Sequence, residues 1–211
     1  MASLLSQLKD DIRFSEGLSA CMNCGICTAV CPAAAYFDYD PRRICQLVQT
    51  GDEQDLENLL KGEEIWMCGQ CLSCKARCPR GNVPGYLIQA LRKLSQQSGH
   101  FIHSREGRKQ IRLKRRIGHS ILETGYCVHP QMVEPETHPE QGPVWVWALE
   151  QGADLYRRCG SNYYGEGEGG LRKMAPGVLD ELEAIFEETG GLRFWEAIER
   201  GAEELKLNTE P

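Results

Sequence analysis

Eight of the chain's eleven cysteines fall into two blocks with the same spacing. The first block reads CMNCGICTAVCP over residues 21–32, and the second reads CGQCLSCKARCP over residues 68–79. Both blocks follow the pattern C-x2-C-x2-C-x3-C-P. Thiolates are soft ligands suited to iron–sulfur clusters or zinc, and this run of cysteines ending in proline is typical of proteins that bind two [4Fe–4S] clusters. The blocks therefore predict two [4Fe–4S] clusters.

The spacing also predicts how the ligands are shared. In two-cluster proteins of this kind, the fourth cysteine of each run ligates the cluster that the other run holds. One predicted ligand set is Cys21, Cys24, Cys27 and Cys78. The other predicted set is Cys68, Cys71, Cys74 and Cys31. Because all eight cysteines are used as ligands, no iron stays open to substrate. The predicted chemistry is electron transfer, and we assign no catalytic residue.

The alternative interpretation of the blocks is a zinc site or a disulfide knot. Structural zinc usually takes its four ligands as two cysteine pairs, whereas each block here offers three closely spaced cysteines and a fourth set back by three residues. We expect small residues such as Gly25 and Gly69 to let backbone amides approach the sulfur atoms. Cys45 lies on an apolar stripe and is predicted to be a buried core residue. Cys127 and Cys159 are isolated and receive no role.

Composition narrows the class of protein. The 211 residues are 41% hydrophobic and 26% charged, and the net charge of −6 argues against a nucleic-acid binder. No apolar run approaches the roughly 18 residues that cross a membrane. The N-terminal stretch MASLLSQLKDDIRF does not resemble a secretory signal, so we expect a cytoplasmic protein whose thiols stay reduced.

The elements that would position the cysteines are predicted to be helices, so the expected fold class is mainly α. Residues 3–13 show an amphipathic pattern. Asp40 can cap a helix that starts at Pro41 and stops at Gly51, and Asp52 can cap a second helix that ends at Gly62. Pro84 opens a further helix, and residues 176–206 read as two helices broken at Gly190 and Gly191. The two capped helices join the cysteine blocks.

The predicted organisation is an α-helical ferredoxin-like domain over residues 1–100 and a helical or irregular extension over residues 101–211. The extension begins with a basic segment, in which residues 105–116 hold seven Lys or Arg and one Glu. A proline-rich loop over 126–143 follows, and residues 180–210 carry ten acidic and three basic residues. The basic segment is either a solvated helix face or a docking surface for an acidic partner. We expect the extension to dock partner proteins of a complex.

The two blocks, the helical spacer and the MCGQCLSCKARCPRG stretch with its following Val83-Pro84 resemble the iron–sulfur C subunit of heterodisulfide reductase. The likeness is clearest to the heterodisulfide-reductase-like complexes of sulfur oxidisers and covers residues 15 to about 97. The resemblance implies a non-catalytic protein of the complex with two [4Fe–4S] clusters. It implies a relay between a flavin-containing A-type protein and a catalytic B-type protein with cysteine-rich CCG motifs, acting on sulfur or disulfide substrates.

Two other functions fit the same cysteines. The spacing also resembles the iron–sulfur proteins of flavin-dependent hydroxyacid and glycerol-3-phosphate dehydrogenase complexes. An interpretation from a different class is a structural or redox-sensing metal-binding protein. The chain has no adjacent Cys-Cys pair and no credible flavin fingerprint, so it resembles neither the B-type nor the A-type protein.

Overall fold

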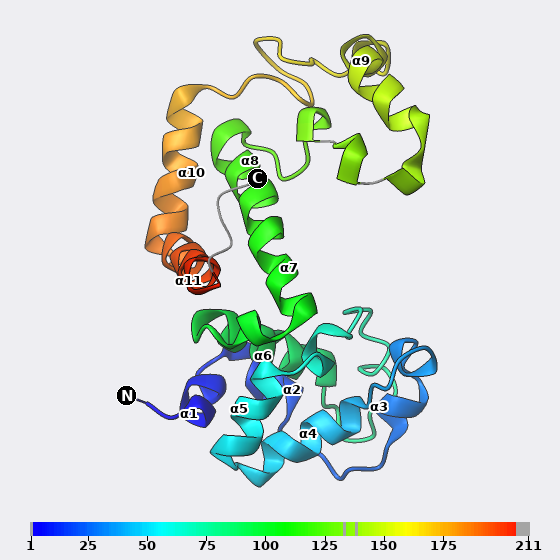
Figure 1. The fold of residues 1–211 in the computed structure, drawn as a ribbon, viewed down its shortest axis with the longest axis vertical. Helices are drawn as coiled ribbons and strands as arrows, with labels where there is room; N and C mark the ends of the chain where they lie inside the picture. The colour runs from blue at the N-terminus through cyan, green and yellow to red at the C-terminus, as the bar shows by residue number, and fades with distance from the viewer. Residues whose placement is uncertain (1, 133, 138, 206–211) are drawn as a thin grey trace. The chain divides into compact units, whose positions relative to one another are not determined.

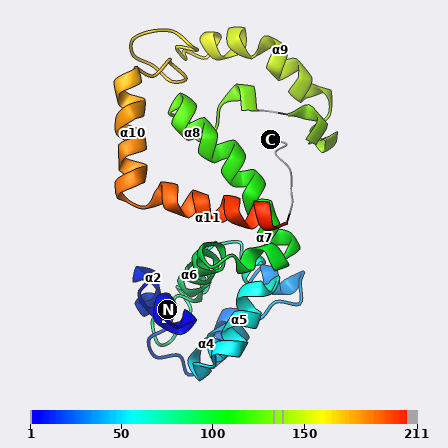
Figure 2. The same cartoon turned by 60° about the vertical axis from the view of Figure 1, so that its left-hand side comes forward.

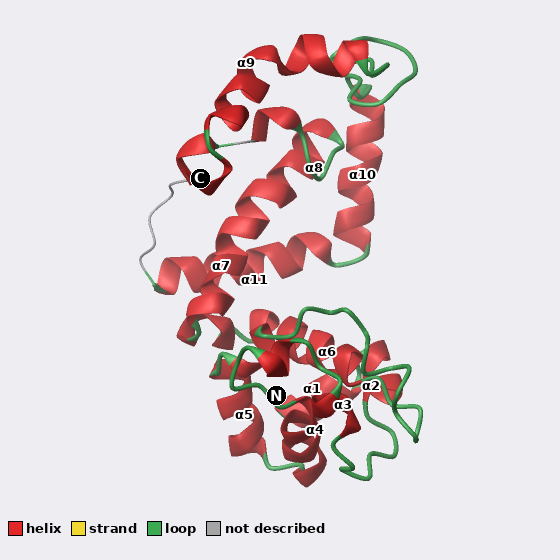
Figure 3. Ribbon diagram, turned by 90° about the vertical axis from the view of Figure 1, so that its right-hand side faces the viewer, coloured by secondary structure: helices red, strands yellow, loops and turns green. Residues whose placement is uncertain are grey.

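The computed structural model describes residues 2–132, 134–137 and 139–205. Helices and loops account for this part of the chain, and no strand occurs in it (Figures 1 and 3). The mainly α fold is therefore confirmed. The chain divides into two compact units, of which the first contains residues 1–110 together with the described residues from Glu196 onward, and the second contains residues 111–195. The predicted domain boundary at residue 100 stays a prediction.

The first unit is built from short helices that frame the cysteine blocks. Their bounds are α1 (Leu4–Lys9), α2 (Ile12–Gly17), α3 (Ile26–Ala29), α4 (Pro41–Thr50), α5 (Glu53–Lys61) and α6 (Pro84–Gln97). Most of the loop in this unit gathers on the side of α3 in Figure 3. The unit thus pairs a helical body with a loop-rich side that carries the cysteines.

The predicted ends of α4 and α5 are confirmed. The Asp40 side chain accepts hydrogen bonds from the first amides of α4, Pro41 is its first residue, and Gly51 follows in a left-handed conformation. Asp52 caps α5 through the Asp55 amide, and α6 begins at Pro84. Side-chain caps satisfy amides that have no partner within the helix, and they are commonly worth about 1 kcal/mol each.

The prediction of one helix over residues 3–13 is wrong. The helix ends at Lys9, and Asp11 caps a separate helix that starts at Ile12. The Asp11 carboxylate binds the Arg13 guanidinium at 2.7 Å and also meets Lys93 of α6 at 3.2 Å. The Arg13 side chain donates hydrogen bonds to this carboxylate and holds the pKa of Asp11 well below its usual range, despite the opposing effect of burial. Ile12, the first residue of the second helix, is 88% exposed.

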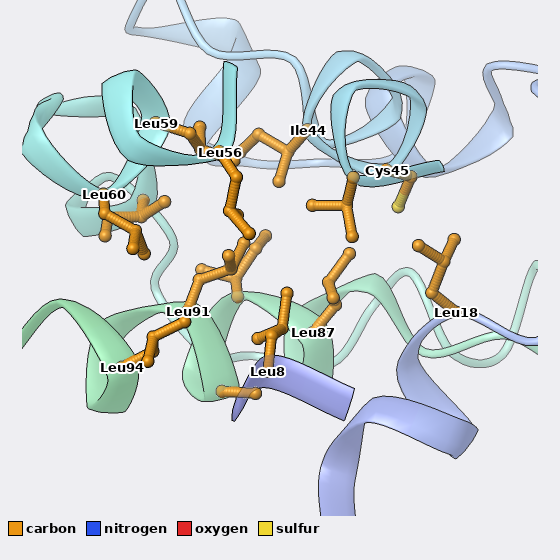
Figure 4. Packing of buried hydrophobic residues seen from close by; sticks show 14 of the residues in the cluster. Leu8, Leu18, Ile44, Cys45, Leu56, Leu59, Leu60, Leu87, Leu91 and Leu94 are labelled. Carbon is orange, nitrogen blue, oxygen red and sulfur yellow. The ribbon is translucent and has the colours of Figure 1, made fainter. Parts of the chain in front are cut away.

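A leucine-rich core joins the helices of the first unit. Figure 4 shows side chains from α4 and α5 facing those of α6, with Leu18 at the edge. Leu8 of α1 belongs to the same core. Leu8, Leu60, Leu87 and Leu91 are fully buried. Cys45 is 1% exposed within this core, as predicted. Burying a leucine side chain is worth about 1.5–3 kcal/mol, so this core fixes the helices from which the cysteine loops extend.

The second unit is helical and irregular, as predicted for the extension. It contains α8 (His119–Thr124), α9 (Pro143–Arg158) and α10 (Pro176–Glu188). Figure 2 shows α10 running beside α8, and residues of these two helices are in contact. Where the structure describes the proline-rich stretch between α8 and α9, the stretch forms short 3-10 turns. Cys127 and Cys159, both exposed, belong to this unit.

The basic segment forms α7 (Arg105–Leu113) and a π-helical turn over Lys114–Gly118. Several of its charges have partners inside the protein. Arg105 and Lys109 contact Glu106, and both Arg112 and Arg116 contact Glu134. The described part of the acidic segment (residues 180–205) lies in α10 and α11 (Gly191–Glu204), with Gly190 between them in a left-handed conformation. Docking of a partner on the basic segment stays a prediction.

None of the helices in the described residues combines the length and apolar character required to span a bilayer.

Helices α2 and α6 approach each other closely at Gly17. A Cβ atom placed there would lie 2.6 Å from the Leu87 amide nitrogen. We predict that Gly17→Ala lowers the free energy of unfolding by about 1–3 kcal/mol, because the two backbones would have to separate. Gly177→Ala is the matched control, since a Cβ there meets nothing within 4 Å. Anaerobic denaturant titration should show a loss only for Gly17→Ala, and equal midpoints would contradict the close packing.

Candidate iron–sulfur cluster sites

The segment before the first block is fastened to the segment after the second. Asn82 is 1% exposed, and its Oδ1 accepts hydrogen bonds from Ser19 N at 2.8 Å, Ser19 Oγ at 3.1 Å and Ala20 N at 3.3 Å. The Val83 amide donates to the Glu16 carbonyl at 2.8 Å. We call these four contacts the Asn82 clasp. The clasp holds Cys21, which follows Ala20, close to the end of the second block.

The first pocket draws cysteines from both blocks. Its lining includes Asn82 and four cysteines, Cys21, Cys24, Cys27 and Cys78. Gln49 of α4 fastens the loop from the other side, because its Nε2 donates to the Cys21 carbonyl at 2.9 Å and its Oε1 accepts from Asn23 at 3.2 Å. The structure therefore brings together all four members of the first predicted ligand set.

The second pocket has the reciprocal composition. It is a cavity of about 300 Å³ whose lining includes Tyr36, Tyr39 and four cysteines, Cys31, Cys68, Cys71 and Cys74. This volume far exceeds the space that one water molecule needs. The second predicted ligand set is thus also brought together, with Cys31 as the single member from the first block.

The two loops repeat the same backbone path. Asn23 and Gln70, each two residues after the first cysteine of its block, have φ of 54°. Gly25 and Leu72, each one residue after the second cysteine, have φ of 84° and 58°. Left-handed residues in such turns direct backbone amides toward a shared anion, a geometry found at many iron–sulfur sites. The two blocks therefore share their backbone conformation as well as their cysteine spacing. They differ in one respect: a positive φ strains Leu72, whereas Gly25 adopts it without penalty.

The sulfur atoms have a mixed polar environment. Burial raises the pKa of the Cys27 and Cys74 thiols, and the Gly85 amide opposes this effect at Cys74. A hydrogen bond with Ser73 lowers the pKa of the exposed Cys71 thiol. The Gln70 amide donates to Cys68 Sγ at 3.4 Å. Amide donors to sulfur are the contacts that stabilise thiolates and tune bound clusters.

Cys45 of α4 has cysteines of both blocks as neighbours. Its thiol pKa is raised chiefly by burial and further by Cys21, Cys27, Cys74 and Cys78. These neighbours come from both blocks. Because a deeply buried thiol resists deprotonation, Cys45 acts as a small apolar core side chain beneath the loops.

The donor set fits iron–sulfur clusters. All eleven cysteines are free thiols, so no disulfide competes for the eight in the blocks. In the described residues, no three His, Cys, Asp or Glu side chains converge closely enough to hold a single metal ion. In the first pocket, the buried Nδ2 of Asn82 has no hydrogen-bond partner within the described chain. Four thiols and a buried donor suit a group that carries several sulfur acceptors.

Sequence reasoning missed three residues around the pockets. Asn82 and Tyr39 are buried polar side chains, and Arg92 donates to the carbonyl oxygens of Ile65 and Cys68, both at 2.7 Å. Isolated polar residues carry no periodic signal, so only the contacts identify them. We expected both Gly25 and Gly69 to be small so that backbone amides can approach the sulfur atoms. A Cβ atom at Gly69 would meet nothing within 4 Å, so space does not require glycine there. Gly25 is needed for its positive φ.

Loss of the three side-chain contacts of the Asn82 clasp should affect the first pocket selectively. We predict that Asn82→Ala loses about half of the bound iron, because Cys21 is no longer held beside Cys78. Asn58→Ala is the control, since Asn58 is exposed and bonds only Gln54 at 3.3 Å among the described residues. Iron analysis after anaerobic purification measures both variants. Full iron in Asn82→Ala would show that the clasp is dispensable.

A comparison with known protein families also indicates iron–sulfur clusters at the cysteine blocks. Residues 17–82 match the family described as a 4Fe-4S dicluster domain. The match begins at Gly17 and ends at Asn82, so it contains both blocks and is bounded by residues of the α2–α6 contact. The chain therefore carries an iron–sulfur domain of the [4Fe–4S] type.

Curated relatives extend the likeness beyond the cysteine blocks. The C subunit of the ferredoxin:CoB-CoM heterodisulfide reductase of Methanosarcina acetivorans is 43% identical over 190 residues, covering 89% of this chain and 69% of the relative. The iron-sulfur C subunit of the CoB–CoM heterodisulfide reductase of Methanopyrus kandleri is 29% identical over 127 residues, 59% of this chain and 60% of the relative. The corresponding C 2 protein of Methanocaldococcus jannaschii is 31% identical over 106 residues, covering 50% and 54%.

These matches correct the extent of the resemblance. The likeness was expected over residues 15 to about 97, but the first relative aligns with 89% of the chain. The chain spans 69% of that relative's length, and 60% and 54% of the lengths of the other two. By its cysteine pockets, its dicluster domain and this identity, the chain belongs to the family of heterodisulfide reductase C subunits, which are iron–sulfur proteins of electron transfer.

Proposed function

We propose that this chain holds two [4Fe–4S] clusters and relays electrons inside a cytoplasmic heterodisulfide-reductase-like complex. Cys21, Cys24, Cys27 and Cys78 would hold the first cluster. Cys68, Cys71, Cys74 and Cys31 would hold the second. Bound there, each cluster would accept and release one electron at a time. The observation that carries the proposal is the composition of the two pockets, each with three cysteines from one block and the fourth from the other.

The short connection between the pockets supports a relay. Cys27 lines the first pocket and Cys31 the second, and α3 (Ile26–Ala29) covers most of the path between them. Four residues of helix rise about 6 Å. The second block repeats the arrangement, with Cys74 and Cys78 separated by the same number of residues. Each block therefore contributes to both pockets, which supports two centres close enough to exchange electrons.

The donor set also argues for a relay rather than a catalytic site. Each pocket offers four thiols, which would occupy the four irons of a cubane cluster. Cys24 and Cys71, the exposed member of each set, place one edge of each pocket near solvent. An electron can enter or leave at such an edge when a partner docks over it.

The partners follow from the family. We propose that electrons pass between a flavin-containing protein of the A type and a catalytic protein of the B type with CCG motifs. The substrate class would be disulfides or protein-bound sulfur. The relative from Methanosarcina acetivorans is named for ferredoxin and the CoB-CoM heterodisulfide, which supports the disulfide class. Membership of the sulfur-oxidiser branch stays a prediction. Anaerobic co-purification with native partners tests this part, and recovery of a hydroxyacid or glycerol-phosphate dehydrogenase would contradict it.

Cross-ligation makes a specific prediction for Cys78→Ser. The variant should lose the cluster held by Cys21, Cys24 and Cys27, although Cys78 lies beside the second block in sequence. Paramagnetic resonance of the reduced protein should show the loss of one signal and the survival of the other. Wild-type protein should contain about eight irons per chain.

Cys31→Ser is the mirror variant and should remove the other signal. Cys159→Ser is the matched control, because Cys159 is exposed and lies in the second unit. If Cys78→Ser and Cys31→Ser each remove the cluster of their own block, the pairing is wrong. Zinc in place of iron after anaerobic purification would refute the relay itself.

A further inference from the structure

The second pocket contains a buried hydroxyl group without a hydrogen-bond partner. Tyr39 is 4% exposed, lines the pocket with Cys31, Cys68, Cys71 and Cys74, and its Oη has no partner within the described chain. Buried hydroxyls nearly always form a hydrogen bond, because leaving one unmade destabilises the folded state. The position of the ring just before α4 is fixed by the core around it. The unmet donor therefore indicates an acceptor inside the pocket.

The cation beside Tyr39 is engaged with other groups. The half-buried Arg92 is close to both Tyr39 and Cys68, but its Nε and Nη2 donate to the main-chain oxygens of Ile65 and Cys68, both at 2.7 Å. Its guanidinium also lies 5.5 Å from the centre of the Trp66 ring. Neither contact uses the Tyr39 hydroxyl. The four cysteines that line the pocket offer sulfur acceptors. Burial raises the pKa of the Tyr39 hydroxyl, and the nearby Cys68 sulfur raises it further.

We propose that the Tyr39 hydroxyl donates a hydrogen bond to a thiolate or sulfide sulfur of the cluster in the second pocket and makes that cluster easier to reduce. The proposal rests on the two-cluster function above. Adding one electron from a reductant such as dithionite forms and breaks no bond, and it places extra negative charge on the sulfurs. A donated hydrogen bond stabilises the more negative state. The adjacent Arg92 cation favours the same state.

The first pocket has a different donor, which makes the test selective. There the unpartnered group is Asn82 Nδ2, an amide, and its Oδ1 is held by the Asn82 clasp. Removal of the Tyr39 hydroxyl should leave that donor unchanged. Only one of the two reduction potentials should therefore respond.

Tyr39→Phe removes the hydroxyl and keeps the ring that fills the core. Tyr36→Phe is the matched control, since Tyr36 lines the same pocket but is 85% exposed. Both full-length variants should be loaded anaerobically, titrated with dithionite and followed by paramagnetic resonance. We expect full iron in both, with a negative shift of one midpoint potential in Tyr39→Phe alone. The shifted signal should be the one that survives in Cys78→Ser.

Two results would overturn the proposal. Full iron with both potentials unchanged in Tyr39→Phe would mean that the hydroxyl bonds water. Loss of iron in Tyr39→Phe but not in Tyr36→Phe would make Tyr39 a structural residue. Either result leaves the two-cluster function intact, which fails separately if wild-type protein holds no clusters.

Discussion

The arrangement of the cysteines depends on the contact between the end of α2 and the start of α6. Two close contacts make it: Gly17 lets the backbones meet, and the buried Asn82 binds the two residues that precede Cys21. A buried side-chain carbonyl with three donors is fully satisfied and therefore resists rearrangement. Because Asn82 follows Cys78 by four residues, this contact places the end of the second block beside the start of the first. A cross-ligated pair of clusters requires the two blocks to meet in this way.

The meeting of the two blocks produces two pockets that share a backbone path but differ in their surroundings. The left-handed residues fall at equivalent positions in both loops, so the cysteines are presented in the same way. The buried donors differ: an amide in the first pocket, and a phenol with a nearby guanidinium in the second. Hydrogen bonds and charge near sulfur set cluster potentials. Two clusters that each have four cysteine ligands can thus have different reduction potentials within one relay.

Much of this could be predicted from the sequence, for physical reasons that differ from residue to residue. The Asp40–Pro41 and Asp52 caps are local signals, so the helices between the blocks could be predicted, and the cysteine spacing indicates the eight candidate ligands. Asn82 and Tyr39 act through contacts between residues far apart in the chain, which leave no spacing pattern. The prediction of a single helix over 3–13 is wrong because Asp11 caps a second helix and binds Arg13 and Lys93. The spacing of apolar residues carries no information about these side-chain contacts of Asp11.

In the proposed arrangement, each iron–sulfur centre takes three cysteines from one block and the fourth from the other. Anomalous X-ray diffraction at the iron edge, from crystals of the anaerobically loaded protein, would locate each centre among the cysteines. We predict two separate iron centres, one bordered by Cys21, Cys24, Cys27 and Cys78, and the other by Cys68, Cys71, Cys74 and Cys31. A centre bordered by Cys21, Cys24, Cys27 and Cys31 together, with Cys78 left beside its own block, would rule out cross-ligation.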